Sequence, residues 1–367
     1  MWPSREQEML LSLLRCSLGG ETDPERIVDF SEGMDWNLFL NMAVYHGISH
    51  LLLSAIKQNR LIKVSGPVID FLEKEYLKNH VMHMVHGEAL KDIFHRFNED
   101  GIRFVVHKGL GLAALLYPEP ELRPCGGDLD ILVPMKDYPA TKASLKELGY
   151  SLSSSDYEVH EISFIGEVKF EKNMGGKKVI VDLHTDLIAN HWGKVTRFRM
   201  EDFWGNLRSV KYNDFFIPHL PPGVYLFFLC IHCAANHIFD RLITFCDLDL
   251  FTKKYSEEID WNHAARYAGQ KGAMKVLYHP LNFCNRLLGT PLPDNILMSV
   301  KPARLSIPMV PERHLLMRQD RPQKSLERYM HLVLLDNPFH IFRSVTIFLK
   351  RLFRESSIRR KTRSARP

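Results

Sequence analysis

The most informative stretch of the sequence is Gly126-Gly-Asp-Leu-Asp-Ile-Leu-Val133. In it a diglycine turn leads into two aspartates and an unbroken apolar run. The pattern predicts a strand that begins at Asp128 and that Pro134 ends. Side chains alternate between the faces of a strand, so Asp128 and Asp130 point the same way. Adjacent carboxylates repel each other, and Mg²⁺ or Mn²⁺ would hold them together with substrate phosphates. A strand-entry turn at Asp128 with a solvated Asp130 is the alternative.

A second acidic strand end follows at Val179-Ile-Val-Asp-Leu-His184. Asp182 comes after three β-branched apolar residues, a pattern typical of a buried central strand with a charge near its end. It is a candidate third metal ligand, or the group that takes a proton from an acceptor hydroxyl; a paired or edge aspartate is the alternative. His184 lies two residues further along the strand on the same face. Three roles are open to it: to orient a carboxylate, to contact substrate, or to form a hydrogen bond with the backbone.

Upstream, Ile102-Arg-Phe-Val-Val-His-Lys108 predicts a short apolar strand, and Gly109 begins a short helix. A glycine here lets the backbone approach a phosphate, a helix N-terminus favours anions, and Lys108 adds a point charge for a triphosphate. The P-loop pattern G-x-x-x-x-G-K-[ST] is absent from the sequence. Arg123 precedes Asp128 by five residues in a proline-rich loop, within reach of the same site. A surface arginine is the alternative.

The surrounding patterns predict an α+β fold, with a small mixed β-sheet core flanked by helical regions. Helical periodicity dominates before Gly101 and after Pro222. Asn173-Met-Gly-Gly176 predicts a hairpin turn between strands at 161–171 and 178–187. Helices are expected over 36–56, 68–97, 137–148, 224–251 and 261–288. The expected organisation is an N-terminal helical region at 1–95, an α/β core at 96–215, a C-terminal helical domain at 216–353 and a basic disordered tail at 354–367.

The composition is that of a folded soluble protein. Of 367 residues, 45% are hydrophobic and 25% are charged, which argues for a large core and against bulk disorder. The net charge of +5 is concentrated in 350–366, which carries eight Lys or Arg and one Glu. The globule is therefore close to neutral, and its basic tail is a candidate for contact with an anionic membrane or with nucleic acid. A docked helix over Phe339–Phe353 with a solvated tail is the alternative.

The sequence favours a cytoplasmic location. The N-terminus is too acidic for a signal peptide, and no apolar run reaches the ~20 residues that span a bilayer, so we expect no transmembrane segment. Sparse cysteines in mostly apolar runs favour reduced thiols over disulfides. They are Cys16, Cys125, Cys230, Cys233, Cys246 and Cys284. For the run Cys230-Ile-His-Cys233 a packed core helix is favoured over a zinc site, because no second cysteine pair follows.

Taken together, Lys108-Gly109 at a strand end, Arg123 in a loop, Asp128-Leu-Asp130 and Val181-Asp-Leu-His184 resemble the pattern of the "uncharacterised nucleotidyltransferase" family. That family belongs to the DNA polymerase β-like superfamily. The resemblance spans about 36–290. It continues in the helical region, where four residues lie either at the nucleotide cleft or in buried polar contacts: His232, Arg241, Asp247 and Asp249.

The resemblance implies a Mg²⁺- or Mn²⁺-dependent enzyme that transfers a nucleoside monophosphate from an NTP, such as ATP, to an acceptor. It implies that the metal ligands and catalytic carboxylates are Asp128, Asp130 and Asp182. It implies that the nucleotide contacts are Lys108, Gly109, Arg123 and His184. The sequence departs from the superfamily pattern, in which a Gly-Ser pair lies a short distance before D-x-D. Here Leu110 follows Gly109 in place of serine, and 18 residues separate Gly109 from Asp128.

The acceptor is not specified by the sequence, and a small molecule, sugar, peptide or protein is expected. Nucleotide addition to RNA or tRNA by a toxin-like enzyme is an alternative, which the near-neutral core disfavours. A non-catalytic scaffold that keeps the fold is a second alternative, which the intact carboxylates disfavour.

Overall fold

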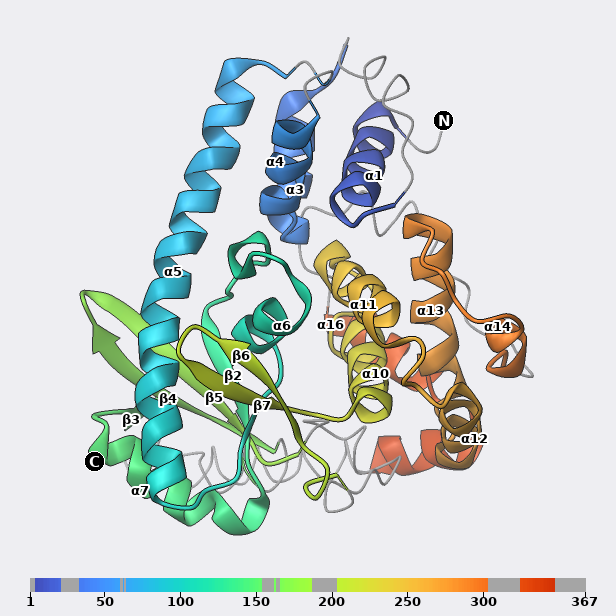
Figure 1. Ribbon diagram of the computed structural model, residues 1–367. Helices are drawn as coiled ribbons and strands as arrows, with labels where there is room; N and C mark the ends of the chain where they lie inside the picture. Colours follow the sequence, from blue (N-terminus) through green and yellow to red (C-terminus); the bar gives the residue numbers. More distant parts are fainter. Residues whose placement is uncertain are drawn as a thin grey trace, which may run out of the picture.

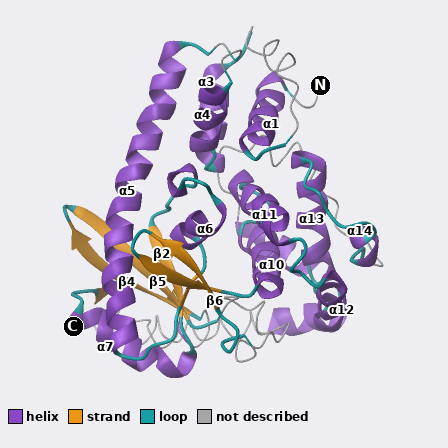
Figure 2. Cartoon of the chain, in the orientation of Figure 1, coloured by secondary structure: helices purple, strands orange, loops and turns teal. Residues whose placement is uncertain are grey.

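The computed structural model describes residues 4–20, 33–59, 62, 64–153, 162, 166–186, 203–302 and 324–346. The fold is α+β, as predicted: helices that precede and follow the sheet in the chain flank a five-stranded mixed sheet (Figure 1, Figure 2). The strand order is β1-β2-β5-β4-β3. The strands are β1 (Val105–Val106), β2 (Asp128–Leu132), β3 (Ser151–Leu152), β4 (Glu167–Met174) and β5 (Lys177–His184).

The register of the sheet aligns charged residues from three strands. β2 and β5 run parallel and pair Asp130 with Asp182, whereas β4 runs antiparallel to β5 and pairs Lys169 with Asp182. Directly paired residues of neighbouring strands point to the same face, so these side chains form a row across the sheet. The parallel pairing requires a long crossover, and this crossover contains α7 (Tyr138–Glu147).

The hairpin between β4 and β5 closes at the predicted turn. Gly175 and Gly176 hold the two central positions with φ of +54° and +76°, and Met174 pairs with Lys177. Positive φ at both central residues is the type I′ geometry, which matches the twist of the flanking strands. Among the described residues, the strand predicted over 161–171 begins only at Glu167.

One face of the sheet packs on the long helix α5 (Gly66–Glu99), which was predicted over 68–97 and passes in front of the strands (Figure 1). Leu90, Ile93 and Phe97 recur at helical spacing on the side that meets the sheet. Their partners in the sheet are Leu129, Ile131, Val168, Phe170, Val181 and Leu183. Full burial of each such side chain contributes roughly 1.5–3 kcal/mol. This apolar layer holds one face of the sheet against α5. Because side chains alternate between the faces of a strand, Asp130 and Asp182 point to the opposite face.

The helical pattern predicted over 36–56 forms two helices, α3 (Trp36–His46) and α4 (Ser49–Gln58). Gly47 divides them, because it adopts φ of +69° and caps α3 in the left-handed conformation. The first helix, α1 (Arg5–Ser17), begins at a capping box between Ser4 and Gln7. Together α1, α3 and α4 form the N-terminal helical layer (Figure 1).

After the sheet, a hairpin that the sequence did not predict leads into the C-terminal helices. Its strands are β6 (Arg208–Tyr212) and β7 (Phe215–His219). The helices are α10 (Pro222–Ile231), α11 (Leu242–Tyr255), α12 (Trp261–Lys271), α13 (Met274–Leu288), α14 (Ile296–Ser299) and α16 (Lys324–Val333). A π-turn, His232–Asn236, separates α10 from α11. Nearly every side chain of α10 is buried, as expected for a helix that is apolar all round.

Short connections complete the architecture. A helix over Gly109–Leu116, α6, follows β1, and a 3₁₀ turn over Pro120–Leu122 lies in the predicted proline-rich loop. In the part of the chain that the structure describes, no helix combines the length and the apolar character needed to cross a bilayer. The basic tail at 354–367 lies outside the described residues, and the domain boundaries at 95, 215 and 353 stay predictions.

Candidate active site

Three carboxylates gather where β2 and β5 lie side by side. Asp128 begins β2, Asp130 lies two residues further, and Asp182 is the partner of Asp130 on β5. The side chain of Asp130 is 9% exposed and that of Asp182 8%, whereas that of Asp128 is 34% exposed. The two buried carboxylates, Asp130 and Asp182, need cations nearby, because an unpaired buried charge is strongly destabilising.

Two lysines supply positive charge to the carboxylates. Lys108 Nζ donates to Asp130 Oδ1 at 2.7 Å. Lys169 Nζ lies 3.3 Å from Asp182 Oδ2 and 3.5 Å from Asp128 Oδ2. Lys108 was selected from the sequence and does lie at the cluster. Lys169 was missed, because only the β4–β5 register brings it opposite Asp182.

The surroundings of the carboxylates shift their pKa values in different directions. Burial alone raises the pKa of Asp130, but the Lys108 ammonium and the hydrogen bond with His184 hold it well below its ordinary value. Burial raises the pKa of Asp182 and that of Asp128, and Lys169 offsets this only in part. Asp130 is therefore a firmly ionised group, whereas Asp182 takes up a proton more readily.

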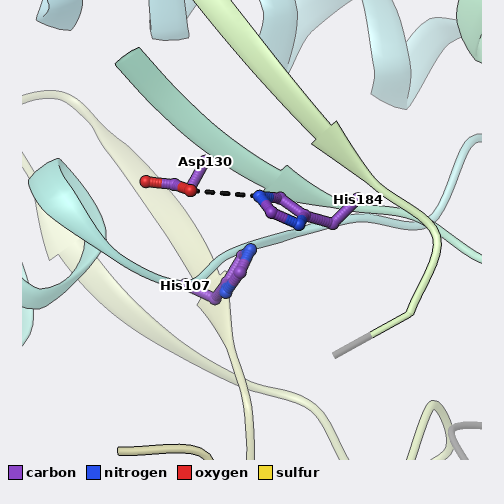
Figure 3. A group of neighbouring side chains, drawn as sticks. All are labelled: His107, Asp130 and His184. Carbon is purple, nitrogen blue, oxygen red and sulfur yellow. Dashed lines mark hydrogen bonds and ion pairs between the residues drawn. The ribbon is translucent and has the colours of Figure 1, made fainter. Parts of the chain in front are cut away.

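Two histidines lie against the carboxylates. His184 Nε2 is 3.0 Å from Asp130 Oδ1 and 3.8 Å from Asp182 Oδ2, and its Nδ1 is 3.7 Å from Glu167 Oε2. His107, which follows β1, stands edge-on to His184 with ring centroids 4.7 Å apart (Figure 3). Neither His107 nor Glu167 was selected from the sequence. The one available signal for His107 was its place next to the lysine that ends the same predicted strand.

Several buried polar atoms of this cluster make no hydrogen bond within the described residues. They are Asp182 Oδ1, His184 Nδ1 and both ring nitrogens of His107. Two sets of ligand atoms lie within 4.8 Å of one another, namely His107 with Asp130 and His184, and Glu167 with Asp182 and His184. Buried oxygen and imidazole nitrogen atoms left open beside carboxylates fit a divalent cation. Asp128, a predicted metal ligand, belongs to neither set.

Arg123 is buried and joins the loop before β2 to α11. Its Nε and Nη2 both donate to the Asp247 carboxylate at 2.8 Å, and its Nη1 donates to the Gly109 carbonyl at 3.2 Å. The Tyr117 hydroxyl donates to the same carboxylate at 2.8 Å. Burial alone lowers the pKa of Arg123, but Asp247 raises it above its ordinary value. The triphosphate contact predicted for Arg123 stays a prediction, and in this structure the guanidinium holds the start of α6.

Close packing explains the two glycines at the start of α6. Gly109 has φ of +42°, and a Cβ on it would lie 3.0 Å from the Cys125 carbonyl oxygen. A Cβ on Gly111 would lie 2.3 Å from the Val106 carbonyl oxygen. The absence of side chains therefore lets the N-terminus of α6 rest on the backbone just before Asp128, beside the carboxylates.

His232 is a residue of the helical region whose charge interacts with Lys108 and Asp130 of this cluster. Its ring stacks on Phe228 with centroids 5.6 Å apart. Burial, the neighbouring His237 and the Lys108 ammonium lower its pKa well below the ordinary value. Phe228 also contacts His107, with centroids 5.0 Å apart. The π-turn thus brings His232 to the edge of the site.

The other polar residues singled out in the helical region make structural contacts. Arg241 lies over the ring of Tyr45 at 4.4 Å. Asp249 Oδ2 pairs with Lys253 at 2.8 Å, and Asp249 Oδ1 accepts a 2.7 Å hydrogen bond from Thr290. All six cysteines are free thiols, as predicted, and five of them are buried.

Three carboxylates on one face of a mixed sheet, with two lysines against them, form an arrangement that can hold divalent cations beside phosphates. The model of a family described as uncharacterised nucleotidyltransferase matches residues 32–289. This match covers more than half of the chain, so the chain belongs to that family and is a nucleotidyltransferase. Comparison with curated proteins and with solved structures gives no match.

Proposed function

We propose that this chain is a metal-dependent enzyme that transfers a nucleoside monophosphate from an NTP, such as ATP, to an acceptor. Its family membership supplies the reaction class. The observation that carries the metal dependence is the parallel pairing of β2 with β5, which sets Asp130 opposite Asp182 and leaves Asp128 on the same face. Three carboxylates on one face of a sheet match the ligands that Mg²⁺ or Mn²⁺ uses beside phosphates.

In this proposal Asp128 and Asp130 hold the divalent ion, and Asp182 is the third carboxylate. The open Oδ1 of Asp182 supports the assignment, because a buried carboxylate oxygen without a hydrogen bond lacks the partner that native structures normally provide. When bound, the ion neutralises charge on the triphosphate and favours in-line displacement at phosphorus.

The lysines and the start of α6 are proposed to bind the triphosphate. The side chain of Lys169 is 47% exposed, so it turns from Asp128 and Asp182 toward an incoming phosphate at little cost. Lys108 lies deeper and compensates Asp130. Gly109 places the N-terminus of α6 at the same point, where a helix start favours an anion. Arg123 donates to the Gly109 carbonyl and so steadies the start of α6 without contacting the triphosphate itself.

The transfer step follows from these positions. An oxygen of the acceptor hydroxyl forms a bond to the α-phosphorus of the NTP, while the bond from that phosphorus to the bridging oxygen of pyrophosphate breaks. The proton of the hydroxyl passes to Asp182, whose pKa is raised by burial. His184, hydrogen-bonded to Asp130 and close to Asp182, fixes the orientation of both carboxylates.

The acceptor remains open between a small molecule, a sugar, a peptide and a protein. Transfer to RNA is tested by the same experiment, because labelled RNA separates from labelled protein and small molecules on extraction. The cytoplasmic location and the tail contacts stay predictions.

The test is transfer of label from α-labelled ATP, CTP, GTP and UTP into a cell extract, with Mg²⁺ or Mn²⁺. The wild type is compared with Asp128→Asn/Asp130→Asn and with the exposed control Asp70→Asn on α5. We expect metal-dependent labelling with wild type and control, and a loss of at least ~100-fold in the double variant. Absence of labelling, together with absence of metal-dependent NTP binding by calorimetry, would overturn the proposal and favour the scaffold.

A further inference from the structure

His107 is a fully buried histidine whose place in the fold has no explanation in packing alone. Its relative exposure is 0%, and neither ring nitrogen makes a hydrogen bond within the described residues. Both backbone polar groups of His107 form hydrogen bonds: the amide donates to the Asp130 carbonyl, and the carbonyl accepts from the Tyr225 hydroxyl. A buried imidazole with two open nitrogens costs folding free energy unless something binds it.

The open ring of His107 faces the two residues that are best placed to share a ligand with it. Asp130 and His184 are joined by a 3.0 Å hydrogen bond, and His107 stands edge-on to His184 (Figure 3). One nitrogen of each ring and one carboxylate oxygen lie within 4.8 Å of one another, and all three residues are buried. They come from the end of β1, from β2 and from β5, so the sheet itself holds them together.

We propose that His107, Asp130 and His184 form a mixed nitrogen–oxygen site for a divalent transition-metal ion such as Mn²⁺, Co²⁺ or Zn²⁺. This inference deepens the proposed function and rests on it for the role of Asp130, since it names the class of ion that this edge of the site selects. The mixed site lies beside the centre that was predicted from carboxylates alone, and the two share Asp130.

The chemistry of the ligands sets the preference. Imidazole nitrogen binds Zn²⁺ and Co²⁺ more tightly than Mn²⁺, and it binds all three better than Mg²⁺, which takes oxygen ligands almost exclusively. Two histidines and one carboxylate therefore favour the transition ions over Mg²⁺, with the affinity rising from Mn²⁺ to Co²⁺. The Lys108 ammonium, 2.7 Å from Asp130 Oδ1, is the competing cation that a metal ion has to displace or accommodate.

The test measures nitrogen ligation directly, without turnover. The full chain is loaded with Mn²⁺, and pulsed EPR is used to detect ¹⁴N coupling from imidazole. Calorimetry then compares the affinity for Co²⁺ with that for Mg²⁺. The variants are His107→Gln and His184→Gln, with His95→Gln on the exposed side of α5 as the matched control. Circular dichroism verifies that each variant is folded.

We expect ¹⁴N coupling in the wild type, its loss or reduction in both site variants, and its retention in His95→Gln. We expect at least ~10-fold weaker Co²⁺ binding in each site variant. Failure of the site variants to fold does not affect the coupling measured in the wild type. Absence of ¹⁴N coupling in the wild type, or unchanged Co²⁺ affinity in two folded site variants, would overturn the inference.

Asp128→Asn separates this inference from the proposed function. It removes a ligand of the proposed nucleotide metal but none of the three residues of the mixed site, so we expect transfer to fall and ¹⁴N coupling to remain. Coupling without any transfer in the wild type would refute the proposed function and leave the mixed site standing. Transfer without coupling would do the reverse.

Discussion

At the scale of single residues, two lysines compensate the charge of the three carboxylates of the site. Lys108 compensates Asp130 at depth, and Lys169 is shared between Asp128 and Asp182 nearer the surface. Removal of one partner of a buried pair leaves a charge without compensation, which costs far more than the pair itself contributes. The pair Lys108–Asp130 is therefore the most sensitive contact of the site.

We predict that Lys108→Met lowers the free energy of unfolding by about 3 kcal/mol without divalent ions, because Asp130 is left without its ammonium partner. Mn²⁺ should restore a large part of this loss, since it replaces the missing positive charge at the same carboxylate. Urea denaturation with and without Mn²⁺ measures both effects. Lys146→Met, a change in an exposed residue of α7, serves as the control. An equal stability of Lys108→Met and the control in the absence of metal contradicts the prediction.

Asp182→Asn tests the role of a carboxylate whose pKa is raised by burial. A raised folded-state pKa means that ionised Asp182 costs folding free energy at neutral pH, and that this cost disappears as the pH falls through the folded pKa. We therefore predict a higher free energy of unfolding for Asp182→Asn than for wild type at pH 7. The difference should shrink toward pH 4, while transfer falls by at least ~100-fold. Urea denaturation at both pH values measures the stability, and the transfer assay measures the activity. A variant less stable than wild type at pH 7 would contradict the prediction.

At the scale of elements, α6 packs against the end of β1 and against the loop before β2. Its start touches the Cys125 carbonyl through Gly109, and its first turn touches the Val106 carbonyl through Gly111. These are backbone contacts, which cannot move aside as a flexible side chain does. The two glycines are therefore required for packing, whatever their part in the proposed binding of phosphate.

We predict that Gly111→Ala destabilises the protein by about 3 kcal/mol or more, because its Cβ would lie 2.3 Å from a backbone oxygen. Gly223→Ala in the first turn of α10 is the matched control. It has no atom within 4 Å of the added Cβ, so it should be neutral or stabilising by about 0.4–1 kcal/mol. Thermal and urea denaturation compare the two. Equal stability of the two variants would show that α6 does not pack on β1 in this way.

The ion pair between Arg123 and Asp247 tests what that arginine does. Asp247→Asn should cost about 3–5 kcal/mol, since it leaves a buried guanidinium without its carboxylate. The double variant Arg123→Met/Asp247→Leu should recover much of that stability, because neither charge then remains buried. If Arg123 acts only by holding α6, the KM for NTP in the double variant stays near the wild-type value. A KM raised ~10-fold or more in a stable double variant would instead support a direct triphosphate contact.

At the scale of the whole molecule, local patterns predicted the elements, and the spatial pairing was only partly predictable. β2, β5, α5 and the turn at Gly175-Gly176 each carry their signal within a few residues, and the structure confirms them. The hairpin β6–β7 and the break at Gly47 were missed, because weak alternation and a single glycine inside a helical pattern are weak signals.

The same distinction holds within the site. The carboxylates were found because they stand in short acidic strand ends. Lys169 and Glu167 were missed because the β4–β5 register alone brings them to Asp182 and His184. The Asp247 partner of Arg123 lies 124 residues away in the chain, and no local pattern joins the two. Contacts between distant segments therefore had to come from the structure.

If Asp128, Asp130 and Asp182 act as proposed, they direct attack on the α-phosphorus of an NTP. The most direct measurement runs parallel reactions with α-labelled and γ-labelled ATP, in the presence of Mn²⁺ and of the acceptor recovered from the extract. We expect the α-label to enter the acceptor and the γ-label to leave as pyrophosphate, and we expect Asp128→Asn/Asp130→Asn to abolish both events. Transfer of γ-label to the acceptor, or α-label transfer that survives in the double variant, would contradict it.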